Sequence, residues 1–177
     1  DSPLFMGPND IDQMSAILDE ASERILFESL ALKIKMKPDR TPVTSADEAS
    51  HFLISQELQK HWPEIPLISE EGVIPTFEER KNWRRFWLLD PLDGTRDLIH
   101  KEDTYTINLA LIENNQPTLG FMVAPGRSVH YRAQVGGTLQ RSLKKGAFES
   151  INHPPRQPKN ILIHSKNDPL DELYQAV

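Results

Sequence analysis

The segment 87–95 constrains the fold of this chain most, because an apolar run stops there abruptly at two carboxylates, Asp90 and Asp93. This pattern predicts a buried strand whose end presents both acids to a cation, and hard oxygen ligands of this kind favour Mg²⁺. Gly94 allows a tight turn, so that the N–H groups of Gly94 and Thr95 face an anion at the start of a short helix. An Asp-Gly pair is also a common turn signal. Taken alone, a segment of this kind is more often a strand followed by an ordinary loop than a binding site.

A second apolar segment, residues 67–69, ends in the acids Glu70 and Glu71. This spacing predicts a neighbouring strand that delivers Glu70 to the same end of the sheet. Further upstream, residues 41–47 read Thr-Pro-Val-Thr-Ser-Ala-Asp and lead into a helical pattern.

The motifs T-P-V-T-x-A-D, S-E-E and W-L-x-D-P-L-D-G-T follow one another along the chain. In this order they resemble the lithium-sensitive, Mg²⁺-dependent phosphomonoesterases typified by inositol monophosphatase. Residues 69–71 and the run 105–112 resemble the bacterial 3'(2'),5'-bisphosphate nucleotidases of this family in particular. The resemblance covers residues 10–170, and three ordered motifs are far more specific than any one of them.

The resemblance implies a site with two Mg²⁺ ions and a small phosphorylated substrate. It assigns metal binding to four residues: Glu70, Asp90, Asp93 and, through its backbone carbonyl, Leu92. Thr95, oriented by Asp47, would position and deprotonate the nucleophilic water. The N–H groups of Gly94 and Thr95 would hold the phosphate.

Several of these residues also have a structural interpretation. Asp47 lies in the first turn of an expected helix, where the helix dipole favours an acid. Thr95 is also suited to capping the turn after Gly94. Glu71 is expected to be an exposed acid or a neighbour of the ligands. The lysines at 33, 35 and 37 are expected to form a solvated strand face, with contact to an anionic substrate as the alternative. The six histidines show no metal-ligand spacing.

The chain departs from the family in two respects. Members carry a further metal-binding Asp in a W-D-x-x-A-type motif, and none of the three tryptophans of this chain is followed by Asp. We therefore expect the chain as given to lack one metal ligand and the sugar or base pocket. Arg96-Asp97 also stands where the nucleotidases usually carry Lys-Glu.

We expect the first of three possible functions, with the other two as alternatives. The first is a Mg²⁺-dependent phosphoric monoester hydrolase that converts adenosine 3',5'-bisphosphate to AMP. The second is an inositol monophosphatase, and the third is a catalytically incomplete fragment that binds metal or nucleotide.

Composition excludes other classes of function. The chain of 177 residues contains no cysteine, which removes disulfides, thiolate nucleophiles and Cys-ligated metals. A net charge of −6 argues against nucleic acid as a partner, and no apolar run is long enough to span a membrane. We expect a cytoplasmic location, with peripheral attachment to the inner membrane left open. The oligomeric state is not indicated.

Helical spacing of apolar residues predicts a first helix over residues 10–29 and a second helix that ends at Pro63. The second helix is expected to begin with a capping box at Ser45–Glu48 and to bury Phe52, Leu53, Leu58 and Trp62. Another capping box, at residues 76–79, predicts a short helical turn.

Alternating patterns predict an exposed strand around residues 32–36 and two hairpins, 104–124 and 129–142. A last strand is expected at 160–164, and Asp168 is expected to cap a further helix. Helices followed by mainly antiparallel strands predict an α+β fold with layered helices on a mainly antiparallel sheet. The resemblance implies that this is the N-terminal part of the sugar-phosphatase fold, without its C-terminal half. We expect residues 1–164 to form this domain and residues 165–177 to begin a truncated second one.

Overall fold

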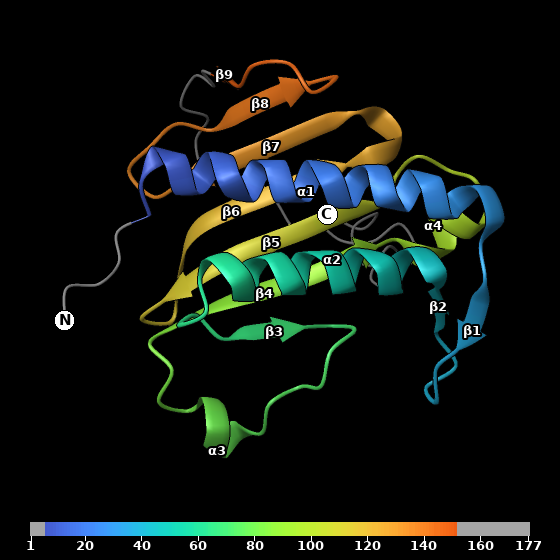
Figure 1. Cartoon of the computed structure of the whole chain (residues 1–177), viewed down its shortest axis with the longest axis horizontal. Coiled ribbons are helices and arrows are strands. Elements are labelled where there is room, and N and C mark those ends of the chain that lie inside the picture. Colours follow the sequence, from blue (N-terminus) through green and yellow to red (C-terminus); the bar gives the residue numbers. More distant parts are fainter. Residues whose placement is uncertain (1–5, 152–177) are drawn as a thin grey trace, which may run out of the picture.

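The computed structural model describes residues 6–151. Two long helices, α1 (Pro8–Glu28) and α2 (Ser45–His61), lie side by side across one face of a seven-stranded sheet (Figure 1). The expected α+β class with layered helices on a mainly antiparallel sheet is therefore confirmed. The strand expected at 160–164, the helix expected at Asp168 and the proposed division at residue 164 lie outside the described residues.

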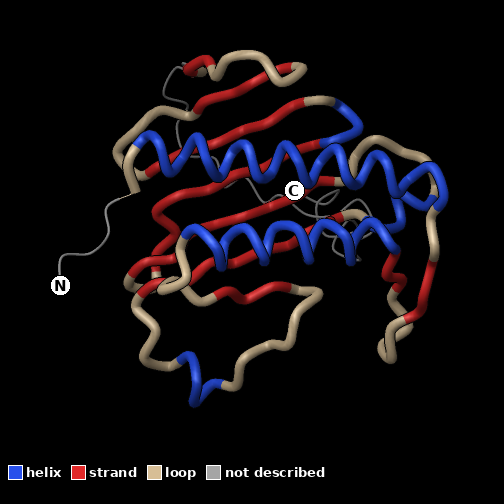
Figure 2. Tube along the Cα trace, in the orientation of Figure 1, coloured by secondary structure: helices blue, strands red, loops and turns tan. Residues whose placement is uncertain are grey.

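The sheet follows the order of the chain from one edge to the other, β3 to β9. β3 pairs in parallel with β4, and all later neighbours are antiparallel. Figure 2 shows the strands as one layer behind the two long helices. The strands are β3 (Leu67–Ser69), β4 (Arg85–Asp93), β5 (Thr106–Glu113), β6 (Gln116–Ala124), β7 (Val129–Gln134), β8 (Gln140–Leu143) and β9 (Glu149–Ser150). Both expected hairpins are present. Asn114 and Asn115 close the first with φ of 49° and 63°, a conformation that Asn tolerates better than most residues.

The first helix has nearly the predicted bounds. Asp10 accepts a hydrogen bond from the N–H of Gly7 at 3.0 Å, and Pro8 occupies the first turn, where it costs no hydrogen bond. The inward face of α1 packs on the sheet through the following buried residues: Met14, Ile17, Leu18, Ala21 and Ile25.

The start of the second helix differs from the prediction by one residue. Thr44, not Ser45, is the N-cap, because its hydroxyl accepts from the N–H groups of Ala46 and Asp47. The prediction for Phe52 is also wrong, since its side chain is 63% exposed. Four-residue spacing selects Ala46, Ser50, Ile54 and Leu58 for the buried face, and Phe52 lies half a turn away from them.

Shorter elements complete the structure. A two-stranded arm, β1 (Ile34–Met36) and β2 (Pro42–Thr44), projects at the end of the molecule where α2 begins (Figure 1). β1 is exposed along its whole length, as predicted. The capping box at Thr76 opens α3 (Phe77–Arg80), also as predicted. The remaining helical turns are η1 (Ser29–Ala31), α4 (Thr95–Ile99) and η2 (Pro125–Arg127).

The core lies between the helix layer and the sheet. Trp87 in the middle of β4 is fully buried, and its ring meets Trp62 of α2 edge-on at a centroid distance of 5.8 Å. Inward-facing residues of β5 and β6 complete the layer: Ile107, Leu109, Leu111, Leu119, Phe121 and Val123. Within residues 6–151, no helix has the length and apolar character needed to cross a membrane.

Candidate active site

The predicted acids meet where β3 and β4 end. The parallel register pairs Ser69 with Leu89, and the N–H of Glu70 donates to the carbonyl of Leu89 at 3.1 Å. Glu70 therefore leaves β3 beside Asp90, as the sequence predicted.

A β-bulge at the end of β4 explains how two acids three residues apart act together. Asp90 pairs with Asn108 and Asp93 pairs with Thr106, so β4 contains one extra residue between these positions. Side chains alternate along a strand, and an odd spacing would otherwise send the two carboxylates to opposite faces. Pro91 lies within the bulge, where its missing N–H breaks no regular ladder.

Gly94 turns the chain from β4 into α4. Its φ is +87°, and an added Cβ would approach the Cα of Tyr105 and an oxygen of Asp97 to 3.2 Å. Only glycine fits this backbone without strain. The turn places Thr95 in the first position of α4, where the N–H has no partner within the helix.

Thr95 and Asp47 are in direct contact although 48 residues separate them. The hydroxyl of Thr95 donates to Oδ1 of Asp47 at 2.7 Å. Oδ2 of Asp47 accepts from the N–H and the hydroxyl of Thr44, at 2.9 and 2.5 Å. Asp47 is 1% exposed. One oxygen of Asp47 thus takes part in the cap of α2, and the other orients Thr95. Both interpretations of Asp47, as a capping residue and as a neighbour of Thr95, agree with these contacts.

Asp90 is the most perturbed acid of the cluster. Burial, the negative charges of Glu70 and Asp93 and a hydrogen bond with Glu70 raise its pKa to about 7, against a weaker opposing hydrogen bond from the N–H of Leu92. That N–H lies 3.2 Å from Oδ1 of Asp90. The Leu92 side chain itself is buried in the core. Carboxylates that repel one another in this way are relieved by a cation, and three carboxylates with a nearby carbonyl form an oxygen donor set suited to Mg²⁺.

The donor set fits a divalent cation but is not closed around one. Within residues 6–151, no three acidic or histidine side chains converge as a preformed cage. Asp93 is exposed, and the Glu70 side chain is 57% exposed.

Lys37 is a site neighbour that the sequence did not reveal. Its ammonium lies 2.6 Å from Glu71 and 4.0 Å from Glu70, whereas we expected a solvated strand face. Burial alone would lower the pKa of Lys37, but the hydrogen bond and charge of Glu71, with Glu70 and Asp47, raise it overall. The alternation of Lys33, Lys35 and Lys37 carries no signal that separates the last of them from the others.

Two side chains of α2 contact the strand ends that carry the acids. The hydroxyl of Ser50 donates to the carbonyl of Pro91 at 2.7 Å and ties the bulge to the helix. Nδ1 of His51 lies 2.8 Å from the hydroxyl of Ser69. Burial lowers the pKa of His51, and the charge of Glu71 partly offsets this effect. Four-residue helical spacing from Ala46 identifies Ser50 as inward-facing, but nothing in the sequence specifies its partner.

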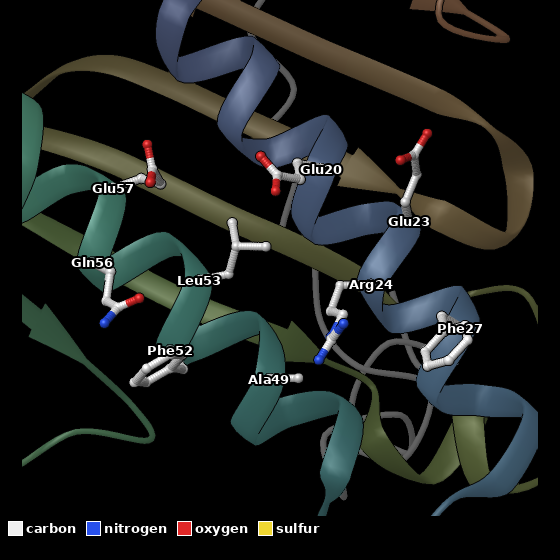
Figure 3. Close-up of a pocket in the computed structure, with 9 residues that line it drawn as sticks. All are labelled: Glu20, Glu23, Arg24, Phe27, Ala49, Phe52, Leu53, Gln56 and Glu57. Atoms are coloured by element: carbon white, nitrogen blue, oxygen red, sulfur yellow. The ribbon is translucent and has the colours of Figure 1, made fainter.

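A groove of about 500 Å³ lies elsewhere, between α1 and α2 (Figure 3). Side chains of both helices line it, including Arg24 and Phe27 from α1 and Leu53 from α2. None of the predicted site residues lines this groove.

Three comparisons with known proteins bear on this site. The model of the inositol monophosphatase family matches residues 11–167. A Salmonella typhimurium protein named 3'(2'),5'-bisphosphate nucleotidase CysQ is 46% identical over 139 residues, 78% of this chain and 55% of that protein. The protein of the same name from Escherichia coli K12 is 37% identical over 156 residues, 86% of this chain and 62% of that protein.

Solved structures agree with the fold. The crystal structure of CysQ from Bacteroides thetaiotaomicron has a TM-score of 0.73 and 26% identity, covering 95% of this chain and 67% of that one. An IMPase/NADP phosphatase complexed with Mg²⁺ and phosphate has a TM-score of 0.67 at 24% identity, covering 74% of this chain and 50% of that one. The chain thus spans between one half and two thirds of the length of these relatives.

Proposed function

Because the chain belongs to the inositol monophosphatase family, we propose that it carries the metal-binding and water-activating part of a Mg²⁺-dependent phosphomonoesterase. The hydrogen bond of 2.7 Å from Thr95 to Asp47, next to the acids at the end of β4, is the observation that carries the proposal. The substrate we propose is adenosine 3',5'-bisphosphate, which loses its 3'-phosphate to give AMP. The names of the relatives from Salmonella typhimurium and Escherichia coli support this choice.

Glu70, Asp90, Asp93 and the carbonyl of Leu92 would hold the metal. Burial and the repulsion of Glu70 and Asp93, which together raise the pKa of Asp90 to about 7, support this assignment. Mg²⁺, when bound, would screen the charge on the phosphoryl oxygens and make water more acidic. The neighbour complexed with Mg²⁺ and phosphate supports the choice of ion.

Thr95 and Asp47 would move the proton. The Thr95 hydroxyl already gives its hydrogen to Asp47, so the lone pairs of Oγ1 are free to accept a hydrogen bond from water. As the water attacks phosphorus, Oγ1 takes its proton and the hydroxyl proton passes to Oδ1 of Asp47. Thr44 fixes the other oxygen of Asp47, so the acceptor keeps its direction throughout.

The turn at Gly94 would hold the phosphate. No side chain at Gly94 stands between the backbone and a ligand, and the N–H of Thr95 has no partner within α4. Backbone N–H groups in such a turn suit a phosphate oxygen.

One feature favours a second substrate. Arg96-Asp97 occupies the position at which the nucleotidases usually carry Lys-Glu, and Asp97 is engaged by the hydroxyl of Thr104 at 2.7 Å. Inositol monophosphate is therefore the alternative substrate.

A substrate panel on the intact protein tests the function. Phosphate release is measured with adenosine 3',5'-bisphosphate and with inositol 1-phosphate, each in Mg²⁺ and in EDTA. We expect Mg²⁺-dependent hydrolysis with kcat/KM at least about 100-fold higher for the bisphosphate, within the range that a polar site achieves between substrates. A preference for inositol 1-phosphate would replace the substrate assignment. Release that persists in EDTA, or none in either condition, would reject the phosphatase.

A further inference from the structure

Glu70 and Glu71 are chemically identical neighbours in very different surroundings. The Glu71 side chain is 12% exposed and lies 2.6 Å from the Lys37 ammonium. The Glu70 side chain is 57% exposed, and its distance of 4.0 Å from the same ammonium is too long for a hydrogen bond. The backbone does not explain why only Glu70 should be available to an ion, because both residues follow the same strand.

Both glutamates lie in the turn after β3. The N–H of Gly72 donates to the carbonyl of Ser69 at 3.1 Å, so Glu70 and Glu71 are the two central residues of a tight turn. Both carboxylates lie near the Lys37 ammonium, but only that of Glu71 is within hydrogen-bond distance. Glu71 meets Lys37, and the backbone of Glu70 remains bonded to Leu89 of β4.

Lys37 is itself held firmly. Its N–H donates to the carbonyl of Thr41 at 2.8 Å, and its carbonyl accepts from the N–H of Arg40 at 2.9 Å. The hydroxyl and N–H of Thr41 in turn donate to Asp39 at 2.6 and 2.9 Å. The ammonium is therefore presented from the closed end of the β1–β2 arm.

We propose that Lys37 is a positioning residue that holds Glu71 away from the cation site, so that Glu70 alone of this pair serves the ion. The inference rests on the proposed function, because it assumes that the acids at the ends of β3 and β4 bind a divalent cation. Its consequence is ion selectivity. Mg²⁺ binds few protein carboxylates and keeps several waters, whereas Ca²⁺ accepts six to eight oxygens in flexible geometry. A released Glu71 would add a carboxylate and favour Ca²⁺.

Calorimetric titration of the intact protein with Mg²⁺ alone and with Ca²⁺ alone tests this role. The quantity of interest is the ratio of the Kd for Mg²⁺ to the Kd for Ca²⁺. We expect Lys37→Met to raise this ratio about 10-fold, since one extra carboxylate at a partly screened site contributes on this scale. Glu71→Gln should leave the ratio unchanged, and the double variant K37M/E71Q should return it to the wild-type value.

The double variant separates positioning from simple charge. Removing the Lys37 charge alone would tighten both ions equally and leave the ratio as it is. Lys35→Met is the matched control, because Lys35 lies on the same arm and pairs with Glu48 instead. Lys37→Leu, which also removes both the charge and the hydrogen bond to Glu71, provides the same test should K37M not fold.

The two proposals fail in different ways. An unchanged ratio in K37M, or a raised ratio that persists in K37M/E71Q, overturns the role of Lys37 alone. A wild-type protein that binds neither ion overturns the metal site of the proposed function and this inference with it.

Discussion

The contact between α1 and β7 and the ends of β3 and β4 both gather charged side chains, but they balance the charge differently. In the first region, Arg132 lies 2.7 Å from Asp12, and Nδ1 of His130 lies 3.0 Å from Asp19. In the second, Asp90 lies among other acids, and their repulsion contributes to a pKa of about 7.

This difference separates a contact whose charges are paired from one that carries an excess of negative charge. Arg132 also donates to Gln140 at 2.8 Å and stacks on Phe148 at 3.7 Å. Its guanidinium group therefore has partners within the protein. Lys37 engages Glu71 at 2.6 Å and lies 4.0 Å from Glu70, and no ion pair within residues 6–151 includes Asp90 or Asp93. An excess of carboxylates that costs stability in the ion-free protein indicates a cation site.

The largest effect is expected at Thr95, on the acidic side of the comparison. Thr95→Ala should lower kcat by about 10²–10⁴-fold, because the proton loses its route to Asp47. Thr95→Ser should retain most of the activity. Thr76→Ala is the control, since Thr76 makes a comparable contact with Glu79 in an exposed capping box. A Thr95→Ala protein with normal kcat and a stability loss of about 1 kcal/mol would show that Thr95 only caps α4.

The next largest effect is a loss of stability expected at the contact between α1 and β7, where the charges are paired. Arg132→Ala should lower the free energy of unfolding by about 2–3 kcal/mol, because it removes the stacking on Phe148 and the hydrogen bonds to Gln140 and to the buried Ser15. Denaturant unfolding measures this loss. Arg127→Ala should cost less than about 0.5 kcal/mol, since Arg127 and Asp103 are both more than half exposed. Equal losses in the two variants would remove the distinction between the regions.

A smaller effect of opposite sign is expected at Asp90. Because its pKa is raised from 3.8 to about 7, ionisation of Asp90 destabilises the folded protein as pH rises through this window. Asp90→Asn should therefore stabilise the Mg²⁺-free protein by about 1–2 kcal/mol at pH 8, after allowance for solvent screening. The gain should disappear below about pH 4, where the acid is protonated in both folded and unfolded states.

Asp12→Asn provides the contrast to Asp90→Asn. Asp12 is paired with Arg132, so the same chemical change should lower stability at pH 8 instead of raising it. Unfolding curves for both variants in EDTA make the comparison. If both Asp90→Asn and Asp12→Asn lower the free energy of unfolding, the view that only the acids around Asp90 lack balancing positive charge is contradicted.

Much of the fold follows from local patterns in the sequence. The spacing of Met14, Leu18, Ala21 and Ile25 predicts α1, and the alternation of Ile107, Leu109 and Leu111 predicts β5. Phe52 was misplaced because its hydrophobicity suggested burial, whereas the helical phase set by Ser50 and Ile54 directs it outward. The phase of a helix against its sheet is a tertiary property.

Part of the candidate site could also be predicted from sequence motifs. The family motifs predicted that Asp47 orients Thr95, and in the structure the Thr95 hydroxyl lies 2.7 Å from Oδ1 of Asp47. The pairing of Lys37 with Glu71 spans 34 residues and depends on how the β1–β2 arm folds back. No local pattern encodes it. A proline within an otherwise regular strand, Pro91, is a weak indication of the bulge. The effect of the bulge on the direction of Asp93 can be derived only from the register with β5.

The thermal stability of the intact protein as a function of Mg²⁺ concentration at pH 8 tests most directly whether the acids at the ends of β3 and β4 form a cation site. Ligand that binds only the folded state stabilises it in proportion to the logarithm of its concentration above Kd. We predict that Mg²⁺ raises the Tm of the wild-type protein progressively and leaves the Tm of Asp90→Asn unchanged. The same rise in both proteins, or none in the wild type, would contradict the account.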